Sequence, residues 1–415
     1  MISPVTAPVR LGIVGGRRGH SFDVALGILA DKVRPTAVCD LSSDVLAGWE
    51  RTWPGIRTYA RLEDLLESGA CDAVYVATPL QGHARQAIAA LRAGVHVLSE
   101  VVAAHTLDDC WALVEAVEAS GATYMLAENY CYMRPNMMVR HMVDAGLFGE
   151  LTYAEGGYIH DCRDLMFTSS GELTWRGELR RDTPGNSYPT HSLGPVAQWL
   201  GINQRDRLVE TATFVSHNAA SWRYAAERFG PQHPAAAPRF FGGGDSATTL
   251  LRTAAGAVIS LRVDWASARP HTMAHYALQG TAGAYLSPRT GDQDRPGDEP
   301  LVWLAGLSPG VSPPASAAQT PRWQTLWDYA ARWEHPLWAT WGQQAAQSGH
   351  GGGDFLVLHD FLRALLHGQA PSIDVYDAVT WSCILPLSVR SVQAGGRPEP
   401  IPDFTRGRMA GAAGP

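Results

Sequence analysis

One segment of seven residues carries several side chains that can move protons or bind hydroxyl groups. Residues 185–191 read Gly-Asn-Ser-Tyr-Pro-Thr-His, so the phenol of Tyr188 and the imidazole of His191 fall within four positions. Gly185 and Pro189 predict a junction between a loop and the apolar helical run that follows. Side chains at such a junction can converge on a ligand, although a turn before a buried helix uses the same residue types. The elements around this segment must decide between the two interpretations.

The bulk composition is that of a globular protein with two domains. The chain has 415 residues, of which 46% are hydrophobic and 18% charged. A net charge of -7 provides no basic field for nucleic acid. No apolar run is long enough to span a membrane and no signal-peptide pattern is present, so we expect a cytoplasmic protein. The six cysteines are scattered, and their spacing predicts reduced thiols and no metal site.

A strand, a glycine-rich turn and a helix follow one another near the N-terminus. Residues 9–14 read as a buried strand, and Gly15, Gly16, Arg17, Arg18 and Gly19 form the turn. This order places a pyrophosphate at a helix N-terminus. The glycine pattern is incomplete, because Arg17 and His20 occupy two positions that hold glycine in a GxGxxG motif. Either arginine of the turn would contact phosphate, unless both are simply solvated.

Strands and helices continue to alternate up to residue 130. The second strand ends at Asp40, where a carboxylate can accept both ribose hydroxyls and would repel a 2′-phosphate, so NAD is favoured over NADP. The alternation predicts a doubly wound parallel (Rossmann) sheet over residues 1–130, with ligands bound at the carboxyl ends of its strands. Further candidate cofactor contacts at those ends are Thr78, Leu80, Gln81, His83, Glu100 and Asn129.

From residue 131 to residue 415 the pattern predicts an α+β domain with a large, open, mostly antiparallel sheet. Its expected strands lie near 151–158, 210–216, 246–252, 257–265 and 276–280. We expect few helices there, a loop over 161–181, and a helix over 355–366 with Asp354 as its N-cap. The exposed face of such a sheet commonly pairs subunits, so we expect a homo-oligomer, either a dimer or a tetramer.

Two stretches of the first domain resemble the Gfo/Idh/MocA family of NAD(P)-dependent sugar oxidoreductases. They are Ala77-Thr78-Pro79 with His83, and the run Ala-Leu-Arg-Ala-Gly-Val-His-Val-Leu-Ser-Glu at 90–100. The family usually continues with a lysine that shares in proton transfer, whereas Val101 follows Glu100 here. The dehydrogenase branch also carries an aspartate four residues before its histidine, where this chain has Ser187.

A more specific resemblance, to glycoside hydrolase family 109, the NAD-dependent α-N-acetylgalactosaminidases, runs to about residue 280 and resumes at His350. The motifs that carry it are Glu128-Asn129-Tyr130-Cys131-Tyr132, Glu155 to Asp161, Trp175-Arg176, Gly185 to Val196 and Gly349 to Gly352. The resemblance implies that NAD contacts Gly16 to Gly19, Asp40, Leu80 to His83, Glu100, Val101, Asn129 and Tyr188. It also implies that Tyr158, Arg176, Tyr188 and His191 face the sugar.

These implied contacts assign roles to individual side chains. We expect Tyr158 or Tyr188 to handle the proton at C2 or C3 of the sugar, with His191 beside it. Arg176 would hold hydroxyls or an anionic group, and His350 is a further candidate for substrate binding. His271 stands where the family has a substrate-binding tyrosine, which puts the N-acetylgalactosamine preference in doubt.

The expected activity is an NAD-dependent glycosidase that oxidises a glycoside at C3, eliminates the group on C1, adds water and reduces C3 again. This route needs acid/base groups rather than the pair of carboxylates that most glycosidases use. Two alternatives remain open. One is an NAD-dependent sugar or cyclitol dehydrogenase or epimerase, and the other is a non-catalytic NAD- or sugar-binding protein.

Overall fold

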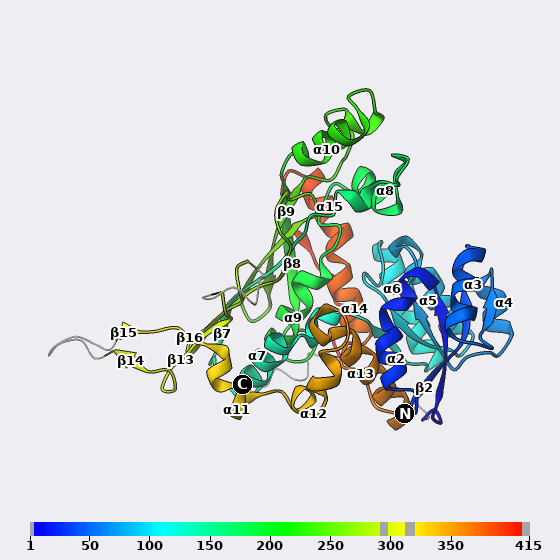
Figure 1. Ribbon diagram of the computed structural model, residues 1–415. Helices are drawn as coiled ribbons and strands as arrows, with labels where there is room; N and C mark the ends of the chain where they lie inside the picture. Colours follow the sequence, from blue (N-terminus) through cyan, green and yellow to red (C-terminus); the bar gives the residue numbers. More distant parts are fainter. Residues whose placement is uncertain (1–3, 291–297, 312–319, 409–415) are drawn as a thin grey trace. The chain divides into compact units, whose positions relative to one another are not determined.

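The computed structural model describes residues 4–290, 298–311 and 320–408, and the chain divides into two compact units (Figure 1). The first unit comprises 1–134 and 336–383, and the second comprises 135–335 and 384–415.

Residues 336–383 therefore pack with the N-terminal unit, whereas the sequence placed them in the second domain. Hydrogen bonds explain this grouping. The backbone N–H of Leu126 donates to the carbonyl of Ile373 (3.2 Å), and the hydroxyl of Tyr132 donates to the carboxylate of Asp360 (2.8 Å). The return of this segment could not be read from local patterns, because the contacts join positions more than 200 residues apart.

The first unit is built on a six-stranded parallel sheet with the order β3-β2-β1-β4-β5-β6, which confirms the doubly wound fold. Its strands are β1 (Val9–Val14), β2 (Val33–Cys39), β3 (Arg57–Tyr59), β4 (Ala73–Val76), β5 (His96–Ser99) and β6 (Tyr124–Leu126). The strand order reverses between β1 and β4, so the right-handed crossovers before and after this point lie on opposite faces of the sheet. Ligands bind where the carboxyl ends of such strands diverge.

Helices cover this sheet. They are α1 (Gly16–Gly19), α2 (Asp23–Ile28), α3 (Ser43–Thr52), α4 (Leu62–Glu67), α5 (His83–Arg92), α6 (Leu107–Ser120), α12 (Pro336–Ala345), α13 (Gly353–His367) and α14 (Val375–Ser382). The start of α6 follows from its sequence, since the hydroxyl of Thr106 accepts the Asp109 N–H as an N-cap (3.1 Å). The helix predicted over 355–366 is confirmed as α13.

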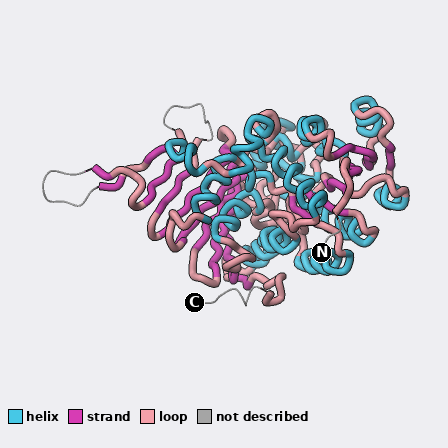
Figure 2. Tube along the Cα trace, turned by 90° about the horizontal axis from the view of Figure 1, so that it is seen from below, coloured by secondary structure: helices cyan, strands magenta, loops and turns pink. Residues whose placement is uncertain are grey.

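The second unit is built on a nine-stranded sheet with the order β16-β13-β12-β11-β7-β10-β9-β8-β17, and Figure 2 shows its strands side by side. Its strands are β7 (Leu151–Ile159), β8 (Leu208–Val215), β9 (Ser246–Thr253), β10 (Val258–Asp264), β11 (Thr272–Gly280), β12 (Gly283–Leu286), β13 (Leu301–Leu304), β16 (Gln324–Thr325) and β17 (Glu399–Pro400). Among these neighbours β7 and β10 run parallel and the other pairs antiparallel, as expected for this domain.

One face of the nine-stranded sheet is covered by two helices. They are α9 (Thr190–Leu200), which packs on β7, β10 and β11, and α15 (Ile384–Gln393), which packs on β8. Gly156 of β7 explains how closely α9 approaches, because a Cβ there would lie 1.8 Å from the carbonyl oxygen of Ser192. The first turn of α9 is thereby held against the end of β7.

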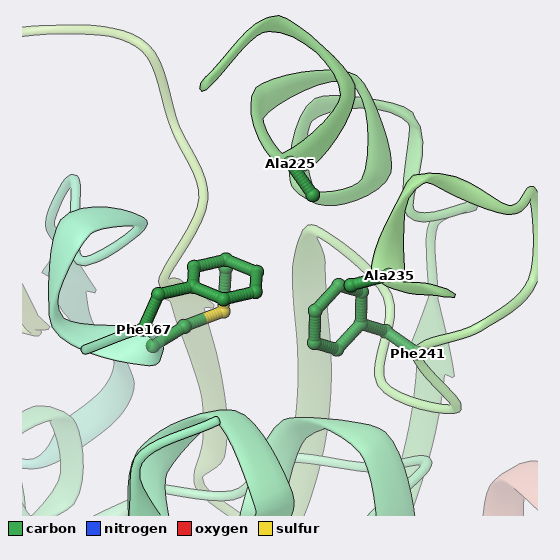
Figure 3. Close-up of a cluster of buried hydrophobic side chains, with 5 residues drawn as sticks. Phe167, Ala225, Ala235 and Phe241 are labelled. Atoms are coloured by element: carbon green, nitrogen blue, oxygen red, sulfur yellow. The ribbon is translucent and has the colours of Figure 1, made fainter. Parts of the chain in front are cut away.

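The expected loop over 161–181 is wrong from residue 175 onward, and the expected scarcity of helices in the second unit is wrong. The structure forms α8 (Trp175–Asp182) and α10 (Ala219–Phe229) in this unit, beside α7 (Arg134–Asp144). A small separate core contributes to the stability of α10, because it packs one side of this helix against residues of the segments 166–173 and 235–241 (Figure 3). Its buried members are Met166, Phe167, Ala225, Ala235 and Phe241, with Leu173, Tyr224, Phe229 and Phe240 packed around them.

None of the helices in the described ranges has the length and apolarity needed to cross a bilayer. The six cysteines are buried and free, as their spacing predicted.

Candidate active site

The glycine-rich turn after β1 is shaped by close contacts. Gly15 has a φ of 97°, and a Cβ there would lie 2.5 Å from the carbonyl oxygen of Ala77, so only glycine fits. The Gly16 N–H donates to the Asp40 carboxylate at 2.8 Å, which fixes the predicted acid beside the turn. A side chain at Gly16 would collide with Trp49, whose indole N–H donates to the Gly16 carbonyl (2.9 Å). The turn thus offers bare backbone next to a carboxylate, which suits a dinucleotide.

Arg18 of this turn is held in place by an ion pair. Its Nε lies 2.6 Å from Oε1 of Glu100, and the Tyr75 hydroxyl donates to the same oxygen at 2.6 Å. Burial acts to raise the pKa of Glu100, but the charge of Arg18 and these hydrogen bonds outweigh it and lower the pKa to about 2. Arg18 is thus paired with Glu100 while 40% of its side chain stays exposed, and this charge pair stands at the end of β5.

A second polar group follows β6. The Asn129 amide Nδ2 donates to Oδ1 of Asp354 (2.8 Å), and Nδ1 of His350 lies 2.9 Å from the other carboxylate oxygen. Asp354 and Asn129 are each only 3% exposed. The Asn129 carbonyl oxygen Oδ1 is buried and has no partner among the described atoms, so it remains available to accept an N–H or O–H from a ligand.

This arrangement corrects the role expected for Asp354. The N-cap of α13 is Gly352, in the left-handed conformation, and Asp354 lies inside the helix. The glycines before it turn the chain so tightly that its carboxylate reaches back to His350. We call Arg18, Tyr75, Glu100, Asn129, His350 and Asp354 the carboxyl-edge cluster. His350, expected near the sugar, belongs to this cluster in the first unit.

His83 has no ring nitrogen left for a cofactor. It is 1% exposed, and its two nitrogens lie 2.7 Å from the Thr78 carbonyl and 2.9 Å from the Val102 carbonyl. Burial lowers its pKa. We assign His83 to holding the turn after β4 rather than to cofactor contact. Of the other predicted cofactor contacts, Leu80 and Val101 are buried, while Arg17 and Gln81 are exposed.

In the second unit, Tyr158 lies at the centre of a group of rings. Its ring centroid is 5.2 Å from that of His191, 5.5 Å from Tyr188, 5.6 Å from His160 and 6.0 Å from His271. Tyr188 and His191 are themselves 5.0 Å apart. The segment 185–191 thus joins the end of β7 in one cluster of phenols and imidazoles, each of which can carry a proton.

Buried hydrogen bonds hold the 185–191 segment. The Asn186 N–H donates to Oγ of Ser388 (2.8 Å), and its side-chain amide donates to Oγ1 of Thr249 (3.2 Å). The Tyr276 hydroxyl donates to the backbone carbonyl of His191 at 2.5 Å. These contacts fix the backbone that presents Tyr188 and His191.

Two members of this group were not predicted as site residues. The ring of His160 lies 3.8 Å from that of His271, and Trp265 lies 5.4 Å from Tyr188. His160 falls within the motif Glu155 to Asp161 but was not assigned a role, although it follows Tyr158 by two residues and could have been found by strand alternation. Trp265 directly follows β10, and its position in the sequence does not indicate which side chains lie beside it. We call Tyr158, His160, Tyr188, His191, Trp265 and His271 the aromatic–histidine cluster.

Arg176 lies on α8, and its charge acts on the Cys162 thiol. Arg176 is half-buried in the first turn of α8, with its guanidinium 4.3 Å from the Trp175 ring. Burial raises the pKa of the Cys162 thiol to about 12, while a hydrogen bond with Tyr158 and the charge of Arg176 act in the opposite direction. Cys162 is thus the group on which both Tyr158 and the charge of Arg176 act. No set of three or more metal-ligating side chains suited to a metal ion occurs in the described parts of the chain.

Comparisons with known proteins match both parts of the chain. Residues 9–128 match the model of the oxidoreductase family with an NAD-binding Rossmann fold. Residues 132–410 match the model of the glycosyl hydrolase 109 C-terminal domain.

Similar proteins span nearly the whole chain. A glycosyl hydrolase family 109 protein of Solibacter usitatus is 36% identical, over 96% of this chain and 89% of the relative. An alpha-N-acetylgalactosaminidase of Tannerella forsythia is 31% identical, over 96% of this chain and 87% of the relative. Among solved structures, levoglucosan dehydrogenase in complex with NADH superposes with a TM-score of 0.71 at 20% identity, over 95% of this chain and 99% of that one, which shows a shared fold.

Proposed function

The chain belongs to glycosyl hydrolase family 109, and from this we propose that it is an NAD-dependent glycosidase whose sugar site is the aromatic–histidine cluster. The observation that supports this proposal most is the contact among Tyr158, Tyr188 and His191, whose ring centroids lie 5.0–5.5 Å apart. Three groups that can carry protons are thus grouped in a domain of glycosidase type, within a chain that also has an NAD-binding unit.

We propose that the first unit holds the cofactor. Asp40 would bind the adenosine ribose, the bare turn at Gly15 and Gly16 the pyrophosphate, and Asn129 Oδ1 a donor of the nicotinamide half. When bound, NAD supplies an acceptor for the hydride at C3 of the sugar and a donor that returns it. The ion pair of Arg18 and Glu100 would keep that end of the sheet rigid.

The residues of the second unit would handle protons. One of the two phenols or His191 takes the proton of the C3 hydroxyl as that carbon becomes a ketone. The ketone acidifies C2–H, a second of these groups removes that proton, and the bond from C1 to the aglycone oxygen breaks. Protonation of the leaving oxygen, water addition at C1 and the reverse proton transfers complete the cycle. Each acid/base group contributes roughly 10²–10⁴-fold.

The test uses p-nitrophenyl α- and β-glycosides with the purified holoenzyme and no added acceptor. We expect nitrophenol release without net NADH, together with deuterium from D₂O at C2 of the released sugar. Stoichiometric NADH with an oxidised sugar would instead indicate the dehydrogenase alternative. Tight NAD binding with no turnover of any glycoside would indicate a binding protein.

We also propose that the open face of the nine-stranded sheet pairs two subunits. Phe214, Leu250 and Val258 lie on that face of β8, β9 and β10 and are 64%, 48% and 39% exposed. Leu250→Lys should shift the protein toward monomer in light scattering after size exclusion. An unchanged mass would contradict this proposal.

A further inference from the structure

Helix α8 carries two arginines one turn apart, Arg176 and Arg180. Neither has a carboxylate within 4 Å in the part of the chain that the structure describes. Their neighbours behave differently, since Arg163 pairs with Asp161 and Arg181 pairs with Asp182. Arg176 and Arg180 thus differ from these neighbours because their guanidinium groups have no carboxylate partner.

Arg180 is buried, with 3% of its surface exposed. Its Nη1 lies 3.4 Å from Oγ of Ser187 and its Nη2 donates to the carbonyl of Gly244, while its Nε has no acceptor. Burial lowers the pKa of Arg180 to about 10, although acidic groups nearby act in the opposite direction. A buried cation without a paired anion is costly, so the charge of Arg180 is incompletely balanced within the chain.

The nearest carboxylates already serve other groups. Asp245 accepts hydrogen bonds from the Ala220 N–H (2.7 Å) and from the Ser221 hydroxyl (2.8 Å) at the start of α10. Asp264 accepts from Arg262 (2.5 Å), Ser267 (3.0 Å) and Ser246. Their remaining influence on Arg180 acts over a longer distance than an ion pair.

Arg180 lies beside the aromatic–histidine cluster, and Arg176 precedes it by one turn of the same helix. Arg180 touches Ser187, the neighbour of Tyr188, and its guanidinium is 6.0 Å from the Trp265 ring. The indole Nε1 of Trp265 is also buried without an acceptor. Arg176 acts on Cys162, which hydrogen-bonds Tyr158. Arg180 Nε and Trp265 Nε1 are thus two N–H donors without acceptors on this side, and a donor requires an acceptor on the ligand. Nδ1 of His160 also lacks a partner, and its role depends on the tautomer.

We propose that the substrate is a glycosiduronic acid, whose carboxylate is held electrostatically by Arg176 and Arg180. This inference rests on the proposed function and adds the substrate class. A carboxylate brings the acceptor oxygens and the negative charge that this side of the cluster lacks, and charge-assisted hydrogen bonds to it are roughly twice as strong as neutral ones. His160 and His271 can add positive charge when protonated.

The same positive charge could instead serve the anion that forms when C2–H is removed from the sugar. The substrate carboxylate and the transient anion differ in when their negative charge is present. A substrate carboxylate is present in the ground state, so arginines that hold it improve the binding of uronides. Arginines that stabilise the transient anion instead improve the turnover of neutral glycosides as well.

The experiment compares p-nitrophenyl glucuronides and galacturonides with the matching glucosides, galactosides and N-acetylgalactosaminides, in both anomers. We expect kcat/KM for one uronide to exceed that of its neutral counterpart by about tenfold or more. Arg180→Met, and separately Ser187→Asp, which adds a carboxylate beside Arg180, should each reduce this preference about tenfold. Arg181→Met, which removes an exposed arginine of the same helix, is the matched control and should leave it unchanged.

A binding measurement separates this inference from the proposed function. Free glucuronate or galacturonate should raise the Tm of the NAD-loaded protein at constant ionic strength, whereas glucose and galactose should not. If Arg180→Met does not fold, Arg176→Met is used in its place and should reduce this rise in Tm. Uronate binding that requires the arginines, without glycoside cleavage, would contradict the proposed function only. Cleavage that favours neutral glycosides, or Arg180→Met slowing neutral and anionic glycosides equally, would overturn the uronide proposal.

Discussion

The two clusters of polar side chains differ in how their charged groups and N–H donors are paired. In the carboxyl-edge cluster, Arg18 and Tyr75 both bind Glu100 at 2.6 Å, so charges and donors are matched within the protein. In the aromatic–histidine cluster, rings pack against one another, and the buried indole N–H of Trp265 has no acceptor. Arg180 beside it likewise leaves its Nε–H unpaired.

This difference indicates what each cluster is built to bind. Matched charges keep a site rigid before its ligand arrives, which suits a cofactor that stays bound. Unmatched buried donors cost stability in the free protein, and a ligand that supplies acceptors recovers that cost. We therefore expect changes in the first cluster to affect stability and NAD affinity, and changes in the second to affect turnover and sugar selectivity.

The largest expected effect separates the clusters by activity. His191→Ala should lower kcat by roughly 10²–10⁴-fold, because it removes a proton-carrying group, while the Kd for NAD should stay within about twofold. Steady-state kinetics and NAD titration by calorimetry measure the two quantities. His217→Ala, an exposed histidine of the same unit, is the control. A loss of NAD affinity equal to the loss of turnover would remove the distinction between the clusters.

The next effect concerns the stability of the first cluster. The lowered pKa of Glu100, about 2 against an ordinary 4.5, means that its charge stabilises the fold at pH values above 4.5. This contribution, about 3 kcal/mol, is lost as the pH falls toward 2. Glu100→Gln should therefore destabilise the first unit at pH 7 and remove this component of the acid sensitivity in urea unfolding.

The control for this measurement is Glu63→Gln, because Glu63 forms a largely exposed pair with Arg61. We expect its unfolding curves to match those of the parent protein. Parallel pH dependence in the parent and in Glu100→Gln would show that the ion pair with Arg18 contributes nothing to folding.

A smaller effect is expected for the positioning of Asn129. Asp354→Asn lets either end of the new amide face Asn129, so the Oδ1 acceptor is no longer reserved for a ligand. We expect the Kd for NAD to rise about tenfold, as for the loss of one good hydrogen bond. Calorimetric titration of the purified protein measures this without reference to activity. Asp31→Asn, at an exposed position of the same unit, should leave the Kd unchanged, and an unchanged Kd in Asp354→Asn would refute the role of Asp354.

The first unit could be predicted from the sequence because its signals are local. Buried strands, turn glycines and acids at strand ends follow one another in order, and the structure places Asp40 and Glu100 at the carboxyl ends of β2 and β5 as expected. The return of 336–383 to this unit was missed, since the partners of Asp354 and Asp360 lie more than 200 residues away.

The second site could be predicted only in part. Tyr158, Tyr188 and His191 were found through a motif and a resemblance, and the structure brings their rings together. Trp265 and Arg180 were missed because their role depends on neighbours from other elements and on missing partners. A missing hydrogen-bond partner leaves no mark in a linear sequence.

The smallest expected effect tests whether the charge of the aromatic–histidine cluster depends on pH. Burial lowers the pKa of His160 from its ordinary 6.5, so its ring is neutral at pH 7.5 and gains charge only as the solution becomes acidic. The titratable groups around it are Tyr158, His191, His271, Asp161 and Asp164. Among these, Asp161 is already paired with Arg163 (2.8 Å), so it does not cancel the new charge.

Binding of free glucuronate or galacturonate should consequently tighten by about three- to fivefold from pH 7.5 to pH 5.5, because the carboxylate of the sugar stays ionised over this range. His160→Gln keeps a hydrogen-bonding side chain but cannot gain charge, so its affinity should stay flat, whereas Arg181→Met should retain the slope. An equal slope in His160→Gln would assign the titration to another group of the cluster. Weaker binding at low pH in the parent protein would show that this cluster does not become more attractive to an anion, and would remove the contrast with the fixed charges around Glu100.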